Sequence, residues 1–62
     1  MTETKGYKLQ ESKQVYTFTT ILGMEEIKYH VFEYEEYTAI EVTGTPLEII
    51  RASSIYQQIT IV

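Results

Sequence analysis

Three glutamates alternate with aromatic residues in the stretch FEYEEY, residues 32–37. Closely spaced carboxylates are the groups that enzymes use for acid–base catalysis and that proteins use to bind hard metal ions. Glu35 and Glu36 are adjacent, so on an extended strand they point to opposite faces and cannot act on one atom. The alternatives for this stretch are a binding surface, or a solvated acidic face beside core tyrosines.

The rest of the chain offers little to complete a catalytic site. His30 is the only histidine, and the chain contains no aspartate to orient it as in a Ser-His-Asp arrangement. The three glycines are far apart, which excludes a glycine-rich phosphate loop. There is no cysteine for a disulfide or a thiolate metal site. We therefore expect a protein that is not an enzyme and that needs no cofactor or metal.

The negative charge is concentrated in the middle of the chain. Residues 25–48 hold seven glutamates against Lys28 alone, whereas residues 1–13 carry a small positive excess. Direct nucleic-acid binding is disfavoured, because lysine and arginine supply most of the affinity for phosphates. A basic protein partner is favoured instead. Tyrosine and phenylalanine are enriched in protein interfaces, which favours a binding role for FEYEEY.

The length of 62 residues predicts a single domain, residues 1–62, with a small core. No segment approaches the roughly 20 apolar residues of a membrane span, and the start MTETKGYK lacks the apolar part of a signal peptide. We expect a soluble, cytoplasmic protein that binds no membrane. Small domains without disulfides or metals are often stabilised by association, so we also expect a homodimer.

Most of the chain has the composition of β-strands. Residues 14–22, QVYTFTTIL, are β-branched and aromatic and predict a strand, and Gly23 predicts a tight hairpin after it. Residues 26–34 alternate between apolar and polar side chains, as in a half-exposed strand. Residues 37–42 either extend that strand or form a third one. Residues 1–12 are mostly polar, and we expect them to be mobile, with contact of YKL, residues 7–9, with a sheet edge as the alternative.

The clearest local signal is the start of a helix at TPLEII, residues 45–50. Thr45 is a good N-cap, Pro46 suits the first helical position, and Glu48 completes a capping box. The pattern predicts a helix of about two turns with Leu47 and Ile50 on its buried side, ending near residues 53–54. Residues 55–62, IYQQITIV, alternate again and predict a final strand.

This order, β-β-(β)-α-β, predicts an α+β fold with an antiparallel sheet of three to four strands and one short helix. At a sheet edge, the apolar final strand would promote aggregation, and pairing with a second copy would remove that risk. We therefore place the dimer seam at the last strand or the helix. The expected interface residues are Ile55, Tyr56, Ile59 and Ile61. A central strand in a monomer is the alternative.

Three segments give the chain a resemblance to a known family. YTFTTIL followed by a turn and FEY, then TPLEII, then IYQQITIV resemble the small uracil-DNA glycosylase inhibitors of Bacillus phages. The resemblance covers about residues 14–62. It implies a dimer of β-β-α-β subunits that mimics DNA and occupies the DNA-binding cleft of the glycosylase. It also implies that the two helices line an apolar pocket for the leucine that the enzyme inserts into DNA.

The resemblance assigns individual positions of the family to residues of this sequence. The aromatic residue that starts the family's helix corresponds to Leu47, and the helix glutamate corresponds to Glu48. A tyrosine one turn later corresponds to Arg51, which replaces an aromatic wall with a positive charge. The pocket would be lined by Leu47, Ile50 and Tyr37. The carboxylates expected to face the basic cleft are Glu33, Glu35, Glu36, Glu41 and Glu48.

These observations predict a stoichiometric inhibitor of uracil-DNA glycosylase. A mimic or anti-defence protein that binds a different DNA-binding protein would have the same sequence features. A small structural or assembly subunit is a third possibility. It would differ in making apolar contacts that salt does not weaken.

Overall fold

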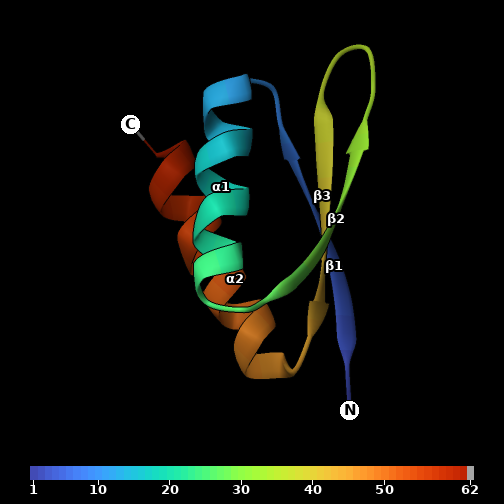
Figure 1. The fold of residues 1–62 in the computed structure, drawn as a ribbon, viewed down its shortest axis with the longest axis vertical. Helices are drawn as coiled ribbons and strands as arrows, with labels where there is room; N and C mark the ends of the chain where they lie inside the picture. Colours follow the sequence, from blue (N-terminus) through green and yellow to red (C-terminus); the bar gives the residue numbers. More distant parts are fainter. Residues whose placement is uncertain (62) are drawn as a thin grey trace.

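The computed structural model describes residues 1–61 and shows two helices and three strands in the order β-α-β-β-α (Figure 1). The elements are β1 (Glu3–Leu9), α1 (Ser12–Met24), β2 (Lys28–Glu33), β3 (Thr38–Gly44) and α2 (Pro46–Thr60). The expected α+β class with an antiparallel sheet is confirmed. The expected element order was wrong: a strand forms at residues 3–9, a helix replaces the strand expected at residues 14–22, and the expected helix continues through the final strand.

The sheet has the order β1-β3-β2, and β3 is antiparallel to both of its neighbours. β1 and β2 are therefore parallel to each other, with β3 between them and α1 connecting them along the chain. Both helices cover the same face of this sheet (Figure 1). β3 supplies the centre of the core with the buried side chains of Ile40 and Val42.

Residues 14–22 lie in α1 and not in the expected strand. Their buried residues, Phe18 and Leu22, are four positions apart and therefore lie on one face of a helix. Threonine usually favours strands, but two threonine hydroxyls in α1 are satisfied locally. Thr17 donates to the carbonyl of Lys13 at 2.9 Å, and Thr19 donates to that of Val15 at 2.9 Å. Packing of the apolar face therefore overrides the local strand preference.

The expected hairpin at Gly23 is instead the C-terminal end of α1. The N–H of Ile27 donates to the carbonyl of Leu22 at 2.9 Å, and that of Glu26 donates to Gly23 at 3.1 Å. These two bonds form a Schellman motif, in which the side chains of Ile27 and Leu22 are both buried. Glu26 occupies the left-handed position of this motif with φ of 59°.

We expect Glu26→Gly to raise the free energy of unfolding by about 1 kcal/mol, because a side chain is unfavourable in the left-handed region. Urea denaturation followed by circular dichroism would measure this change. Glu26→Ala is the matched control, since it removes the carboxylate but keeps a β-carbon at the strained position. An equal gain from both variants would attribute the effect to charge and contradict the backbone explanation.

The capping box at the start of α2 is confirmed. The Thr45 hydroxyl accepts the N–H of Glu48 at 3.3 Å, and the Glu48 carboxylate accepts the N–H of Thr45 at 2.8 Å. The helix continues to Thr60, past the end expected at residues 53–54 and through the predicted strand. Its buried residues, Ile49, Ala52 and Ile55, recur with helical spacing. No helix among residues 1–61 is long and apolar enough to cross a membrane.

The N-terminal segment, which the sequence predicted to be mobile, contains the strand β1. In β1, Tyr7 and Leu9 are buried. The Tyr7 hydroxyl lies 2.6 Å from the Ser53 hydroxyl and donates to the carbonyl of Ile49 at 3.4 Å, which ties β1 to α2. The ring of Tyr7 also packs edge-on against Phe18 at a centroid distance of 5.4 Å. Alternate core side chains in β1 therefore hold the polar segment in the sheet.

Candidate functional site

The FEYEEY stretch forms the end of β2 and the turn into β3, which we call the hairpin tip (residues 33–37). The N–H of Tyr34 donates to the carbonyl of Tyr37 at 2.9 Å and continues the β2–β3 register into the turn. The two tyrosine rings lie 5.0 Å apart with an interplanar angle of 33°. Glu35 and Glu36, between the two tyrosines, are exposed. The turn thus holds two packed rings beside two exposed carboxylates.

Within residues 1–61, no ion pair involves a glutamate of the hairpin tip. The only ion pair in this range joins Arg51 to Glu25. The nearest recorded cation, the Lys8 ammonium, lies 4.9 Å from the centroid of the Tyr37 ring. This contact is a cation–π interaction, which steadies the ring without pairing a carboxylate. Glu33, Glu35 and Glu36 therefore remain open to a partner.

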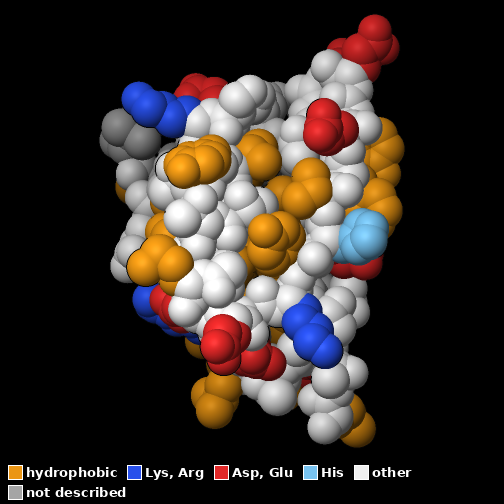
Figure 2. All heavy atoms as spheres, viewed as in Figure 1, with side chains coloured by type: hydrophobic (Ala, Val, Ile, Leu, Met, Phe, Trp, Pro, Cys, Tyr) orange, Lys and Arg blue, Asp and Glu red, His pale blue; other side chains and the backbone are white. Residues whose placement is uncertain are grey.

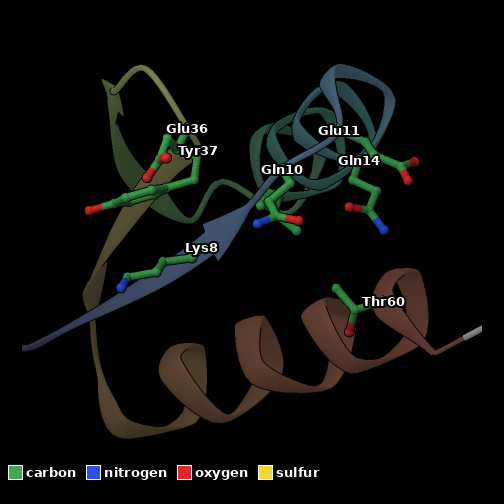
Figure 3. Close-up of a pocket in the computed structure, with 8 residues that line it drawn as sticks. Lys8, Gln10, Glu11, Gln14, Glu36, Tyr37 and Thr60 are labelled. Carbon is green, nitrogen blue, oxygen red and sulfur yellow. The ribbon is translucent and has the colours of Figure 1, made fainter.

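A cleft of about 600 Å³ lies beside the hairpin tip (Figure 3). Glu36, Tyr37 and Lys8 lie on one side of it, and the side chains from the start of α1 lie on the other. The cleft is lined by Lys8, Leu9, Gln10, Glu11, Gln14, Glu36, Tyr37 and Thr60. Sequence reasoning missed Lys8 and Gln10, because it treated residues 1–12 as mobile, and it missed Gln14, because it placed this residue in a strand. The alternation of Tyr7 and Leu9 was the available signal for the strand β1.

The expected apolar pocket of Leu47, Ile50 and Tyr37 is not assembled. Tyr37 precedes the first residue of β3, whereas Leu47 and Ile50 follow its last residue, so the length of the strand separates them. Leu47 and Ile50 were also expected on the buried side of the helix, but they are 78% and 64% exposed. The capping box places the buried stripe of α2 at Ile49 and Ala52 instead.

The remaining candidate residues are spread over the molecule. Glu41 lies in β3 directly opposite His30, on the sheet face that the helices leave open. Glu48 is engaged in the capping box, and Arg51 binds Glu25. The structure therefore gathers Glu33, Glu35, Glu36 and Tyr37 at one site. It does not bring Glu41, Glu48 or Arg51 to them.

The residues expected at a dimer seam belong to α2 and not to a strand. Ile55 is buried in the core of this chain. The Tyr56 hydroxyl donates to the carbonyl of Lys8 at 2.7 Å, and Ile59 packs partly buried against the core. Only Ile61 is a large exposed apolar side chain among the four. A strand-to-strand seam through residues 55–62 is therefore excluded for the part of the segment that the structure describes.

Arg51 and Glu25 form a bidentate ion pair between α2 and the end of α1. The Nε and Nη2 atoms of Arg51 donate to the two Glu25 oxygens at 2.8 Å and 2.6 Å. These hydrogen bonds hold the pKa of Glu25 below its ordinary value and raise that of Arg51. Because the pair is exposed, its contribution to stability is small.

We expect the contribution of this pair to vanish in acid. The pKa of Glu25 is lowered in the folded state, so the stabilisation is complete above the unfolded pKa and is lost as the pH falls through the folded pKa. Arg51→Gln should therefore be slightly less stable than the parent at neutral pH and equally stable once Glu25 is protonated. Urea denaturation of both proteins across this range would test the convergence. A constant difference would show that Arg51 acts through packing.

Comparison with protein-family models, with curated proteins and with solved structures finds no match to this chain.

Proposed function

We propose that this chain is a protein-binding module whose hairpin tip docks onto the basic, nucleic-acid-binding surface of another protein. The observation that carries this proposal is the arrangement at residues 33–37. Three glutamates without an ion-pair partner among residues 1–61 surround two packed tyrosines. Like a phosphate backbone, this arrangement presents several negative charges at close spacing on a fixed frame.

The rings and the carboxylates have different parts in this binding. Tyr34 is 56% exposed and is held against Tyr37, so it offers rigid contact area at little cost in conformational entropy. The carboxylates attract a basic surface over a distance and mainly raise the rate of association. Such binding weakens with salt, because ions screen exposed charges. No catalytic step is needed for this role.

We propose uracil-DNA glycosylase as the target and DNA mimicry as the mode of inhibition, because the sequence resembles inhibitors of this enzyme. The element order β-α-β-β-α differs from the β-β-α-β subunit that the resemblance implies, and the helix pocket is not formed. The acidic hairpin tip is the feature that supports the proposal. It would enter the DNA cleft of the enzyme in the cytoplasm, which is the host cytoplasm if the chain is phage-encoded, and so block base-excision repair. A different DNA-binding protein is the alternative target.

A uracil-excision assay tests this target directly. Purified bacterial uracil-DNA glycosylase would be titrated with the chain on a uracil-containing oligonucleotide, at low and at moderate salt. Loss of excision near equal molar amounts, with weaker inhibition at moderate salt, would support the proposal. Full activity at a large excess of the chain at low salt would exclude this enzyme. A pull-down with the hairpin-tip variants as controls would then search for another DNA-binding partner.

A further inference from the structure

The sheet face that points away from both helices carries a row of aromatic side chains. In β2, His30 and Phe32 lie on this face, because Val31 between them pairs with a buried residue of β3. The Tyr34–Tyr37 hydrogen bond adds one more pair to the ladder, so these two rings follow on the same face. We call this set of four rings, His30, Phe32, Tyr34 and Tyr37, the aromatic row. It runs from the middle of the sheet to the hairpin tip.

The rings of the aromatic row are exposed but held against one another. Phe32 is 39% and Tyr34 is 56% exposed, so neither ring belongs to the core. His30 packs against Phe32, and Tyr34 packs against Tyr37, each at a centroid distance of 5.0 Å. Figure 2 shows apolar side chains beside the single histidine along the side of the molecule away from the helices. Packed rings of this kind offer contact area to a partner at little cost in conformational entropy.

Beside the aromatic row, the middle of this face has small side chains around one carboxylate. Glu41 is exposed and lies between Gly6 of β1 and His30 of β2. A β-carbon at Gly6 would meet no atom within 4 Å, and Ala39 is the neighbouring residue of β3 on this face. The one ion pair described in residues 1–61 lies elsewhere. Within this range, the Glu41 carboxylate therefore has open space on its β1 side, a ring on its β2 side and no ion-pair partner.

A cation of the chain itself already lies on one ring of the row. Lys8 shares this face, since it pairs with Ala39 across the sheet, and its ammonium lies 4.9 Å from the centroid of the Tyr37 ring. The negative face of an aromatic ring attracts cations in this way. Lys28 is the other lysine of this face and lies at its far end, opposite Thr43. Among residues 1–61, no cation lies on the other rings of the row, which leaves them for the cations of a partner.

We propose that this face binds arginine side chains from an extended segment of the basic partner. The inference rests on the proposed function, whose contact area it extends from the hairpin tip to the centre of the sheet. A guanidinium group stacks flat on an aromatic ring and also pairs with a carboxylate through two hydrogen bonds, whereas a lysine ammonium has no plane to stack. Glu41 beside the rings of His30 and Phe32 offers both kinds of contact. A phosphate-bearing ligand fits this face less well, because the Glu41 carboxylate would repel it.

The spacing of the carboxylates indicates that the bound segment is extended. Glu41 follows Tyr37 by four residues, which corresponds to roughly 14 Å along an extended chain, and Glu36 adjoins Tyr37 at the hairpin tip. Two arginines four positions apart in an extended segment span the same distance, so one can reach Glu41 while the other reaches the tip. In a helix, the same two arginines would be only about 6 Å apart along the axis.

Fluorescence anisotropy with labelled peptides would test this recognition. At equal salt concentration, we expect the parent chain to bind an octamer of arginine about 5-fold more tightly than an octamer of lysine. Phe32→Leu should remove most of this preference, since leucine keeps an apolar side chain but has no ring. Tyr29→Leu is the matched control, because Tyr29 is also 39% exposed in β2 but lies on the opposite face. The proposal would be overturned by equal affinities for the two peptides, by an equal loss of preference in both variants, or by binding of neither peptide.

A second test uses the lysine that already lies on the row. Lys8→Met should raise the affinity for the arginine octamer about 3-fold at moderate salt, because it frees the Tyr37 ring for a guanidinium group. Lys13→Met removes the same charge from an exposed residue of α1, and it should change the affinity little once salt screens distant charges. Equal gains from both variants at moderate salt would show a general effect of net charge and contradict binding at the ring.

Phe32 and Glu41 lie outside residues 33–37, so their variants separate this inference from the proposed role of the hairpin tip. In the excision assay, Phe32→Leu and Glu41→Gln should each weaken inhibition about 3-fold, whereas Glu3→Gln, at an exposed position of β1, should not. If inhibition depends on Glu35 and Glu36 but not on Phe32 or Glu41, the tip proposal stands and this one fails. If the glycosylase is not inhibited but the arginine octamer is still preferred, the face binds a different basic partner and this inference stands.

Discussion

Replacing Phe18 with alanine is expected to lower the free energy of unfolding by about 3–5 kcal/mol. The Phe18 side chain is fully buried, and its ring packs against those of Tyr7 at 5.4 Å and Tyr56 at 5.9 Å. The substitution therefore removes ring contacts between α1 and both β1 and α2. A domain of this size has a total stability of about 3–9 kcal/mol, so the variant is expected to be partly or wholly unfolded at room temperature.

Urea denaturation of Phe18→Ala beside Thr20→Ala would measure this effect. Thr20 is an exposed residue of the same helix, and its substitution should change the free energy of unfolding by no more than about 0.5 kcal/mol. If residues 14–22 formed a strand, Phe18 and Thr20 would lie on the same face and both would affect the core. Comparable losses from the two variants would therefore argue against helix α1.

Neutralising the hairpin tip is expected to have the largest effect on binding. For Glu35→Gln combined with Glu36→Gln, we expect association with uracil-DNA glycosylase at low salt to slow by about 10-fold, because exposed charges act mainly on the association rate. The amide keeps the shape of the carboxylate, and neither glutamate has an ion-pair partner among residues 1–61 whose loss would disturb the fold. Surface plasmon resonance at two salt concentrations would measure the rate.

The control for this experiment is Glu3→Gln combined with Glu26→Gln. It removes the same charge from exposed residues outside the hairpin tip, at β1 and at the end of α1. Its association rate should fall much less. An equal fall in both double variants would mean that net charge, not the tip, attracts the partner. If the rates of the tip variant and the parent stay different at high salt, the tip acts through direct contacts as well.

The sequence revealed those parts of the fold in which local chemistry has a single structural meaning. Thr45 and Glu48 predict the start of α2, because a capping box exists only at a helix N-terminus. The alternation of apolar and polar residues in residues 26–34 predicts β2, because this period-two pattern is typical of a half-exposed strand. At residues 55–59 the spacing fits both a strand and a helix, since Ile55 and Ile59 are four positions apart, a separation that places two residues on one face in either structure. Packing of Ile49, Ala52 and Ile55 against the core selects the helix.

The candidate site divides in a similar way. Glu33, Glu35, Glu36 and Tyr37 are close in sequence, and a single turn brings them together, so the sequence was sufficient to find them. The cleft beside them combines that turn with the end of β1 and the ends of both helices. Its far walls depend on where β1 packs, and that packing depends on Tyr7 and Leu9 fitting beneath α2. Long-range contacts of this kind are not visible in a local pattern.

The strand order β1-β3-β2 also has a consequence for the order in which the chain folds. β2 and β3 are joined by a short turn and can pair early, whereas β1 must wait for β3, with Glu3 meeting Gly44 across most of the sequence. During synthesis, β1 leaves the ribosome first and remains without its neighbour until β3 has emerged. Closure of this long loop, not helix formation, is therefore the slow entropic step in reaching the native topology.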